Sequence, residues 1–493
     1  MTRFQSPDHY AHASDSYQIL PFRFLRWEDG DVLLVNMVGE YEFINSTQFH
    51  EFATHKLEPS TPEFENFKAK HFLADSVSTL PLQLLATKYR TKMSFLEGFT
   101  KLHLFVVTLR CDHSCPYCQV SRVTEERGKF DMSTATADRA IDLMFHSPSE
   151  ALKVEFQGGE PLLNFDLVTY IVERTEQRNA TEQREIEFVI ATNLSPLTEK
   201  MLAYCKEHNI SLSTSLDGPA FLHDHNRPRR GGNSYEHTIM QLQHARAVLG
   251  HDRVSALMTT TSQSLQYPRE IIDTYVQHGF TSIFLRPISP YGFAVRTNMA
   301  FQYAATQFLT FYRTGLAYLI ELNRRGTPIL EVYTQLLLRK ILTPFPTGYV
   351  DLQSPAGTGI SVVAYNYDGN VYASDEARML AEMRDTTFCL GNLHELTYDE
   401  LFGGDTIRAL VRASCLQTLP GCTDCAYLPY CGADPIFHWT TQGDPIGHRP
   451  TSAFCTKNMG IFNYLFTLLK QADPYTVRLF TSWATEQPAP SVQ

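Results

Sequence analysis

From residue 102 onward, short apolar segments alternate with segments of helical periodicity. The six apolar segments are 102–108, 152–156, 186–192, 210–216, 254–260 and 282–287. Helices are predicted to begin between them, near Ser133, Asn164, Leu197, Ser234 and Gln266. Apolar strands separated by helices predict a parallel sheet buried on both faces. Six repeats predict an α/β fold with a partial (β/α)6 TIM-like barrel, closed by a helix within 301–325, with its chemistry at the carboxyl ends of the strands.

Three cysteines follow the first predicted strand at a C-x3-C-x2-C spacing: Cys111, Cys115 and Cys118. This spacing lets one short loop place three thiolates around one face of a four-iron cube. The fourth iron then has no protein ligand and is open to bind and reduce another molecule. A zinc knuckle or an incomplete four-cysteine site is the alternative. A zinc site needs four ligands, however, and the nearby candidate is His113 inside the loop.

Polar motifs also follow the later strands. The run Q-G-G-E-P places Gly158, Gly159 and Glu160 at the end of the second strand. Adjacent glycines allow a ligand to approach the backbone, and Glu160 can pair with an ammonium group. The third strand ends at Thr192 and Asn193. The fourth ends in S-T-S-L-D-G-P, whose D-G-P segment also suits a plain turn.

A second cysteine set lies near the C-terminus. Its members are Cys422, Cys425, Cys431 and Cys455, the first three at a C-x2-C-x5-C spacing. Four thiolates ligate a 4Fe–4S cube completely, and zinc is the alternative because four-thiolate sites suit both metals. The other three cysteines, Cys205, Cys389 and Cys415, fit no template and are interpreted as buried free thiols.

The three-cysteine loop, with Tyr117 just before its last cysteine, resembles the signature of the radical SAM superfamily. The resemblance implies that the open iron binds S-adenosylmethionine (SAM) and that one electron cleaves it to a 5′-deoxyadenosyl radical. It also implies that the G-G-E-P motif binds the methionine amino group. Residues that end later strands are expected to complete the SAM site. They are Asn193, Ser213, Ser215 and Arg227, with Ser215 and Arg227 on the ribose and carboxylate, and Leu285 against the adenine.

The C-terminal set resembles the SPASM extension of peptide-modifying radical SAM enzymes, which carries two auxiliary clusters in its full form. Three cysteines of one of those clusters are replaced here by Ser354, Ser374 and Pro435. The resemblance therefore implies one auxiliary 4Fe–4S cluster, held by the four C-terminal cysteines. It also implies that Asp375, next to the Ser374 position, faces the substrate and acts as a catalytic base; a solvated loop acid is the alternative.

The sequence suggests four domains. They are an N-terminal winged-helix-like or peptide-recognition module at 1–95, the barrel at 96–335, a loop-rich SPASM-like iron–sulfur domain at 336–465, and a C-terminal helix with a disordered tail at 466–493. The first of these is a small α+β module, with strands predicted around Asp29–Gly30 and Gly39–Glu40. It either binds a leader peptide by adding it as a strand, or is a plain extension that covers one end of the barrel.

The composition limits the classes of partner that are expected for this chain. Of 493 residues, 43% are hydrophobic and the net charge is −11, without a long basic run. This argues against nucleic acid as the main partner. No apolar run approaches the ~20 residues needed to span a bilayer, and the first residues lack the apolar core of a signal peptide. A cytoplasmic protein without a membrane partner is therefore expected, in which ten cysteines are more typical of metal sites than of disulfides.

Whole-chain similarity points to a peptide substrate. The segments F-R-F-L-R-W-E-D-G-D, N-R-P-R-R-G-G-N-S-Y and C-G-A-D-P look like the His-Xaa-Ser system radical SAM maturase of the B type. The resemblance implies a ribosomally made precursor peptide, with His-Xaa-Ser repeats in that family, and a second radical SAM maturase as partner. A low-potential donor such as flavodoxin or ferredoxin would supply electrons. The implied reaction is hydrogen abstraction followed by an intrapeptide cross-link.

Three alternatives stay open at this point. The first is an anaerobic sulfatase-type maturase that oxidises Cys or Ser to formylglycine. The second is a precursor-binding partner of a second radical SAM enzyme, without radical chemistry of its own. The third is a binding protein structured by zinc.

Overall fold

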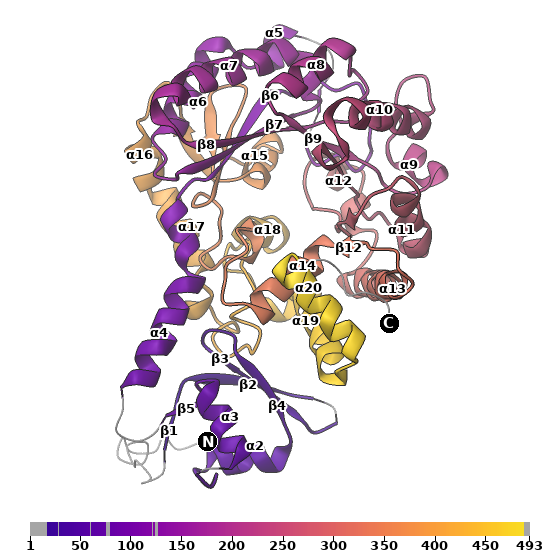
Figure 1. Ribbon diagram of the computed structural model, residues 1–493. Helices are drawn as coiled ribbons and strands as arrows, with labels where there is room; N and C mark the ends of the chain where they lie inside the picture. Colours follow the sequence, from indigo (N-terminus) through magenta and orange to yellow (C-terminus); the bar gives the residue numbers. More distant parts are fainter. Residues whose placement is uncertain are drawn as a thin grey trace.

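The computed structural model describes residues 17–27, 29–59, 61–74, 79–120, 122–123 and 127–487 (Figure 1). Its main feature is an eight-stranded sheet in the order β10-β9-β8-β7-β6-β13-β14-β15. The barrel strands of this sheet are parallel and comprise β6 (Leu102–Thr108), β7 (Ala151–Gly158), β8 (Glu185–Ala191), β9 (Ser211–Ser215) and β10 (Val254–Leu257). The expected partial-barrel fold is confirmed.

Helices cover the outer side of these strands, as the βαβ pattern requires (Figure 1). They are α5 (Arg127–Phe130), α6 (Thr134–Phe145), α7 (Phe165–Glu182), α8 (Glu199–Glu207), α9 (Ala220–Asn226), α10 (Ser234–Leu249) and α11 (Pro268–Gln277). The predicted starts of the long ones were close. Ser133, for example, caps α6 by accepting a hydrogen bond from the Thr136 amide.

The sixth predicted strand differs from the expectation. It shortens to β11 (Ser282–Ile283) and pairs with β12 (Leu330–Glu331) in a separate two-stranded sheet. An isolated bridge between Thr260 and Pro287 links it to the barrel. The barrel edge is then covered by α12 (Gly292–Arg296), α13 (Ala305–Arg324) and α14 (Val332–Leu342).

The barrel sheet is not apolar on both faces. Along β7, Leu152, Val154 and Phe156 are buried in the main core, whereas the intervening Glu155 and Gln157 line a cavity inside the barrel. The same alternation along β9 turns the Ser213 and Ser215 side to that cavity. The polar residues of the strand pattern therefore form the inner lining, and the apolar ones hold the helices.

The C-terminal region is joined to the barrel sheet itself. Strand β13 (Val362–Tyr365) pairs in parallel with β6 and continues through a hairpin at Asp368–Gly369 into β14 (Asn370–Tyr372), followed by β15 (Cys389–Asn392). The hairpin was predicted, but the pairing with β6 was not. The remaining helices are α15 (Asp375–Glu382), α16 (Tyr398–Gly403), α17 (Asp405–Ser414), α18 (Pro435–Gln442), α19 (Ala453–Gln471) and α20 (Pro474–Thr485).

The N-terminal module contains an antiparallel sheet of β2 (Phe22–Arg26), β3 (Val32–Asn36) and β4 (Tyr41–Ile44), and a small pair of β1 (Gln18–Ile19) with β5 (Leu73–Ala74). Its helices are α2 (Ser46–Ala53) and α3 (Pro62–Ala69), and α4 (Leu80–Lys92) leads to the barrel. Asn45 caps α2 by accepting a hydrogen bond from the Gln48 amide.

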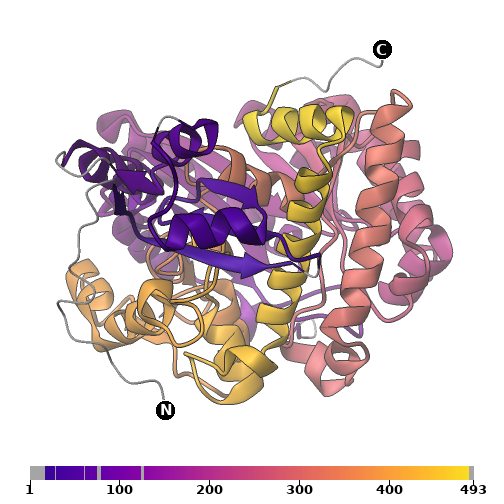
Figure 2. The same ribbon diagram turned by 90° about the horizontal axis from the view of Figure 1, so that it is seen from below.

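Strand β3 has two buried faces. Val32 and Leu34 belong to the core of the module, while Leu33 and Val35 join the main core. The Tyr430 hydroxyl donates to the Gly39 carbonyl, and Tyr41 packs edge-on against Phe466 of α19. The module thus lies across the C-terminal region, as seen from below in Figure 2, rather than on the barrel.

No helix among the described residues is long and apolar enough to cross a membrane. The tail predicted to be disordered, 485–493, falls largely outside the described residues, since the description ends at residue 487 and α20 ends at Thr485.

Candidate functional site

The three-cysteine loop is anchored at its base by a buried arginine. Arg110 donates to both carboxylate oxygens of Asp131, at 2.7 and 2.8 Å, and to the Leu163 carbonyl at 2.8 Å. Arg110 is 4% exposed, so this charge-assisted pair is well shielded from solvent. Thr108, the last residue of β6, donates to the same carboxylate. The start of the loop is therefore fixed relative to the strand before it.

Backbone contacts hold the rest of the loop. The Ser114 amide donates to the Pro228 carbonyl, and the Phe293 amide donates to the Cys118 carbonyl at 2.7 Å. At Gly292 the chain passes so close that a Cβ would lie 2.4 Å from the Gln119 carbonyl oxygen, at a φ of +58°. A segment almost 180 residues later in the chain thus fixes the end of the loop.

Gly158 and Gly159 pack against the base of the cysteine loop, and their predicted role toward the cofactor stays a prediction. A Cβ on Gly158 would lie 1.9 Å from the Thr108 carbonyl oxygen, and one on Gly159 would lie 2.3 Å from that of Arg110. The amide of Gly159 donates to Thr108, and that of Glu160 donates to Arg110. The glycines therefore let the end of β7 pack on the base of the cysteine loop. The backbone that approaches them is the protein's own.

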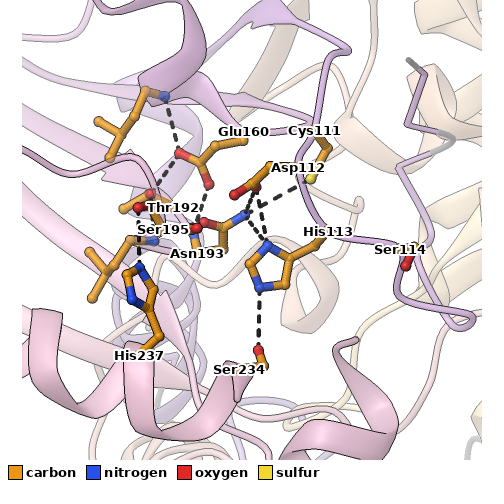
Figure 3. A network of polar contacts seen from close by, with 12 residues as sticks. Cys111, Asp112, His113, Ser114, Glu160, Thr192, Asn193, Ser195, Ser234 and His237 are labelled. Carbon is orange, nitrogen blue, oxygen red and sulfur yellow. Dashed lines mark hydrogen bonds and ion pairs between the residues drawn. The ribbon is translucent and has the colours of Figure 1, made fainter. Parts of the chain in front are cut away.

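Glu160 lies behind the cavity wall, fully buried. Its carboxylate accepts from the Thr192 hydroxyl at 2.6 Å and from the amides of Asn193 (2.7 Å) and Leu162 (3.1 Å), as Figure 3 shows. Burial raises its pKa to about 7 in spite of these bonds. In this position, Glu160 links the end of the second barrel strand, β7, to the end of the third, β8. Its predicted role on the methionine amino group stays a prediction.

Asn193 extends this network to the cysteine loop. Its amide nitrogen lies 2.8 Å from Asp112 Oδ1, 2.9 Å from His113 Nδ1 and 3.9 Å from Cys111 Sγ (Figure 3). Burial opposes ionisation of Asp112, but hydrogen bonds to His113 and Ser195 hold the pKa of its carboxyl well below the usual value. His113 is thus engaged beside the loop with Asp112 and Ser234.

On the other side of the loop, Tyr117 and Arg227 meet at Asp217. The Tyr117 hydroxyl donates to Asp217 Oδ2 at 2.6 Å, and Arg227 Nε lies 3.5 Å from the same oxygen. The Arg227 guanidinium also lies 5.6 Å from the centre of the Tyr117 ring, within cation–π range. Asp217, read from the sequence as a turn residue, therefore positions two predicted cofactor contacts.

A cavity of about 670 Å³ opens at the carboxyl ends of the strands, and we call it the cysteine cavity. Nearly all the predicted site residues of the barrel line it: Cys111, Cys115, Cys118, Tyr117, Gly158, Gly159, Asn193, Ser213, Ser215 and Arg227. Glu160 and Leu285 are the exceptions. Leu285 is buried with its side chain against Gly315 of α13, so the structure does not bring it to this cavity.

Two thiols of the loop, Cys111 and Cys115, are poorly ionised. Burial and the nearby Glu160 raise the pKa of Cys111 well above the usual value, and burial raises that of Cys115 to about 12. Metal ligation requires thiolates, so a bound metal centre would displace these protons. The protein is therefore expected to release protons when the loop takes up its metal.

The C-terminal cysteines gather in a second place. Cys422, Cys425 and Cys431 lie in successive turns, and Cys455 lies in the first turn of α19. Burial and the three other thiols together raise the pKa of Cys425 to about 12, which reflects their proximity. Arg449 Nε donates to Cys422 Sγ at 3.2 Å, and Asn458 Nδ2 lies 3.8 Å from Cys431 Sγ.

The three positions where cysteines are missing have structural roles instead. Ser354 donates to Gln417 and accepts from the Leu416 amide. Ser374 caps α15 by accepting from the Ala377 amide, and Pro435 is the first residue of α18. Cys205 is fully buried in the main core, as expected for a free thiol. Cys389 and Cys415 are half-buried, with weak contacts to neighbouring oxygens.

Asp375 lines the cysteine cavity, but its carboxylate is held by a buried arginine. Arg378, which is not exposed to solvent, donates to Asp375 Oδ1 from Nε at 2.9 Å and from Nη2 at 2.8 Å. The predicted role of Asp375 as a base is not tested by this arrangement.

Sequence reasoning missed a group of carboxyls beside Asp375. Asp351, Glu376 and Asp434 come from separate segments and line a second cavity of about 550 Å³, which we call the aromatic cavity. Burial and the neighbouring Asp351 and Asp375 raise the pKa of Glu376 to about 7. Burial, Asp351 and Glu376 raise that of Asp434 well above the usual value. No sequence motif marks this group, because its members meet only in the folded chain.

The barrel and its cysteine loop define a class of protein before any comparison is made. A parallel partial barrel whose first strand leads into C-x3-C-x2-C has the architecture of the radical SAM enzymes. Residues 105–274 match the model of the radical SAM superfamily. The chain therefore carries a radical SAM domain, whose family uses a 4Fe–4S cluster and SAM as cofactors.

Curated relatives cover only part of the chain. An uncharacterised protein of Methanocaldococcus jannaschii is 30% identical over 190 residues, which is 38% of this chain and 63% of that protein. The radical SAM cyclopropyl synthase TigE of Paramaledivibacter caminithermalis is 24% identical over 28% of this chain and 31% of its own length. The chain thus spans less than two thirds of the length of these relatives.

Solved structures extend the likeness of fold to the C-terminal region. The enzyme anSMEcpe with bound AdoMet and the Kp18Cys peptide has a TM-score of 0.61 at 18% identity, covering 75% of this chain and 98% of that one. Streptococcus suis SuiB bound to the precursor peptide SuiA has a TM-score of 0.52 at 14% identity, covering 89% and 99%. The chain resembles these two proteins in fold.

The residues present fit the family's cofactors. Arg227 Nε is buried without a hydrogen-bond partner among the described residues, and it lies with Ser213 and Ser215 on the wall of the cysteine cavity. This Nε lies in the ion pair with Asp217, and the other N–H groups of the guanidinium suit a carboxylate. Within the described part of the chain, no three His, Cys, Asp or Glu side chains converge on one metal ion. Three thiols in one loop beside an open cavity are donors that suit a four-iron cube with one free iron.

Proposed function

We propose that this chain is a radical SAM peptide maturase that forms a cross-link within a ribosomally made precursor peptide. One observation carries the proposal. The cysteine cavity and the aromatic cavity share part of their walls, namely Phe284, Arg286, Tyr349, Asp351 and Glu376. A side chain held in the aromatic cavity is therefore next to the space where the three-cysteine loop and Arg227 face one another.

The chain's own residues have defined tasks in this proposal. Cys111, Cys115 and Cys118 hold the first cluster, and Arg227 and Ser215 orient SAM at its carboxylate and ribose. Asp217 keeps Tyr117 and Arg227 in position. When bound, the cluster and SAM supply a 5′-deoxyadenosyl radical. The surrounding barrel keeps water away from that radical.

The proposed reaction is an oxidation of the peptide. Two bonds to hydrogen break and one carbon–carbon or carbon–heteroatom bond forms, so the peptide loses two protons and two electrons. The 5′-deoxyadenosyl group takes one hydrogen atom, which is one proton with one electron. An auxiliary 4Fe–4S cluster, which the four C-terminal cysteines would hold, would take up the second electron, and a carboxylate of the cavity wall would take the second proton. A low-potential donor such as flavodoxin or ferredoxin supplies the electron that cleaves SAM.

The substrate and partner assignments rest on resemblance. The precursor is expected to carry His-Xaa-Ser repeats, and a second radical SAM maturase is expected to act on it as well. The N-terminal module is proposed to bind the leader of the precursor, because β2 and β4 are both edge strands of its sheet. SuiB bound to the precursor peptide SuiA supports a peptide substrate through likeness of fold alone.

The test is anaerobic incubation of the reconstituted full chain with SAM, dithionite and the precursor. We expect 5′-deoxyadenosine and a peptide lighter by two hydrogen atoms, with tandem mass spectra that show a loop between two residues. Deoxyadenosine without any change in peptide mass contradicts the proposal. A peptide lighter by two hydrogens that reacts with a hydrazine probe, as an aldehyde does, indicates a sulfatase-type oxidation instead.

A further inference from the structure

The aromatic cavity lies between the barrel edge and the start of α19. Its walls come from the loop after β11, from α13 and α14, and from the segments that flank α18 and α19. Much of the wall is aromatic, formed by Phe284, Tyr291, Tyr303, Phe308, Tyr333, Tyr349, Phe437 and Phe454. Its volume of about 550 Å³ is within the range of small-molecule sites and suits one large side chain with its neighbours.

Three carboxyl groups, Asp351, Glu376 and Asp434, lie on this wall. They are close enough to repel one another, since each of the first two raises the pKa of Asp434. The ion pairs nearby join Arg378 to Asp375 and Arg227 to Asp217; within the described residues, none involves these three groups. Burial and mutual repulsion favour the protonated form of these carboxyls in the empty cavity, and a cation that enters it favours their ionised form.

Two cations also line the cavity but do not pair with the carboxylates. Lys457 Nζ lies 5.2 Å from the centre of the Tyr333 ring and 5.1 Å from that of Phe454. Arg286 is on the wall shared with the cysteine cavity. Lys457 and Arg286 act on Asp351 at longer range, without an ion pair. A cation that enters the cavity can therefore make direct contacts to carboxyl oxygens that no cation of the wall occupies.

An independent observation comes from Tyr291. Its side chain is 1% exposed and lines the same cavity, and its hydroxyl has no hydrogen-bond partner among the described residues. The field of Asp434, Glu376 and Asp351 acts directly on this hydroxyl. The Thr440 side chain acts on this hydroxyl without closing a hydrogen bond. A polar group of an occupant can supply that bond at the end of the cavity where the carboxyls lie.

We propose that the aromatic cavity binds a cationic side chain of the substrate, an ammonium or a guanidinium group, and so selects a basic residue near the site of modification. The carboxylates accept its hydrogen bonds, Tyr291 contributes a further polar contact, and the aromatic faces cover the aliphatic stem and the charge. This proposal rests on the proposed function, because it names a feature of the peptide that would enter the barrel.

The probes for the test are the N-acetyl methylamides of lysine and arginine, compared with those of norleucine and citrulline, which have similar shape without charge. Binding to the anaerobically reconstituted full chain with SAM is measured by saturation-transfer NMR, which detects millimolar affinities. We expect each cationic probe to bind at least about 10-fold more tightly than its neutral counterpart, as for hydrogen bonds to charged groups. Equal binding of charged and neutral probes, or no detectable binding of the cationic ones, would overturn the proposal.

Asp434→Asn is the decisive variant. Asp434 caps α18 by accepting from the Phe437 amide at 2.8 Å, and asparagine caps a helix equally well, so the change removes charge with little effect on folding. We expect it to reduce the preference for the cationic probes to about 2-fold or less and to leave the neutral probes unchanged. Weakening of all four probes alike would indicate a structural defect and contradict the proposal. Glu376→Gln provides a second variant, and the exposed Asp252→Asn is the matched control.

The proposed function can be tested separately from the cationic site. Release of 5′-deoxyadenosine is measured on the same preparations. Charge-selective binding without SAM cleavage would refute the maturase and keep the cationic site. SAM cleavage with a cross-linked product, but without charge-selective binding, would refute the cationic site alone.

Discussion

The two cysteine sets are built in contrasting ways. Cys111, Cys115 and Cys118 follow a buried strand, and their loop is held by its backbone and opens on a large cavity. The C-terminal four lie in turns and at the start of α19, where Arg449 and Asn458 point nitrogens at sulfur. A centre that binds a ligand needs open space beside it, whereas a centre that only exchanges electrons is tuned by donors to its sulfurs. The predictions below test this contrast.

The largest effects are expected from single cysteine substitutions. Cys115→Ala should remove about half of the iron, as one of two four-iron cubes, and abolish release of 5′-deoxyadenosine. Cys425→Ala should remove the other half and abolish the cross-linked product, while SAM cleavage continues. Iron and sulfide analysis with product chromatography checks both. Loss of all iron in either variant would show that the two sites do not assemble independently.

The next largest effect is expected from a backbone contact at the base of the three-cysteine loop. Gly159→Ala places a Cβ 2.3 Å from the Arg110 carbonyl oxygen, and neither backbone segment has room to move. We expect a loss of about 2–4 kcal/mol in the free energy of unfolding of the apoprotein, measured in urea.

The control is Gly128→Ala, where a Cβ would meet nothing within 4 Å. It should change the stability by less than about 0.5 kcal/mol. An equally stable Gly159→Ala would mean that the end of β7 does not pack on the loop as described.

Much of the site around the three-cysteine loop was predictable from local sequence patterns. Strand β6 and its cysteines could be located because a buried strand and a metal-binding spacing are both encoded in neighbouring residues. The reason for Gly159 could not be found in this way, because the Arg110 backbone that excludes a side chain is some 50 residues distant in the chain. The pairing of β13 with β6 and the proximity of Asp351, Glu376 and Asp434 could not be predicted from local sequence either. These depend on tertiary contacts that leave no periodic signal.

A buried, neutral histidine lies near each cysteine set. We therefore expect the free energy of unfolding to depend on pH. Burial and a neighbouring arginine lower the pKa of His223 to about 3 and that of His438 to about 4. An unfolded histidine takes up its proton near pH 6.5, so below that pH the unfolded chain binds more protons and the folded state loses stability. Each histidine should lower the free energy of unfolding by about 1.3 kcal/mol when the pH falls from about 7.5 to about 5.5.

The measurement is urea unfolding of the apoprotein at both pH values. His438→Gln and His223→Gln should each lose about 1.3 kcal/mol less than the unsubstituted chain on acidification. His251→Gln, at a half-exposed histidine beside Asp252, is the control and should follow the unsubstituted chain. A pH response unchanged in all three variants would show that these imidazoles protonate in the folded state.

The smallest expected effect concerns the sulfur donors. Arg449→Gln removes a positive charge 3.2 Å from Cys422 Sγ, so the reduction potential of the auxiliary cluster should fall by on the order of tens of millivolts. A redox titration followed by electron paramagnetic resonance, with Arg408→Gln on the surface of α17 as control, measures it. The potential of the loop cluster should stay constant. A shift of both potentials would contradict the separate tuning of the two centres.

Strand β13 gives the molecule a fixed internal geometry. Because it pairs with β6 through Val362–Leu102 to Tyr365–Phe105, the C-terminal region is part of the barrel sheet and not a hinged lid. Swinging it away would require breaking an inner strand pairing. The relative position of the three-cysteine loop and the segment that follows β13 is therefore set once, during folding.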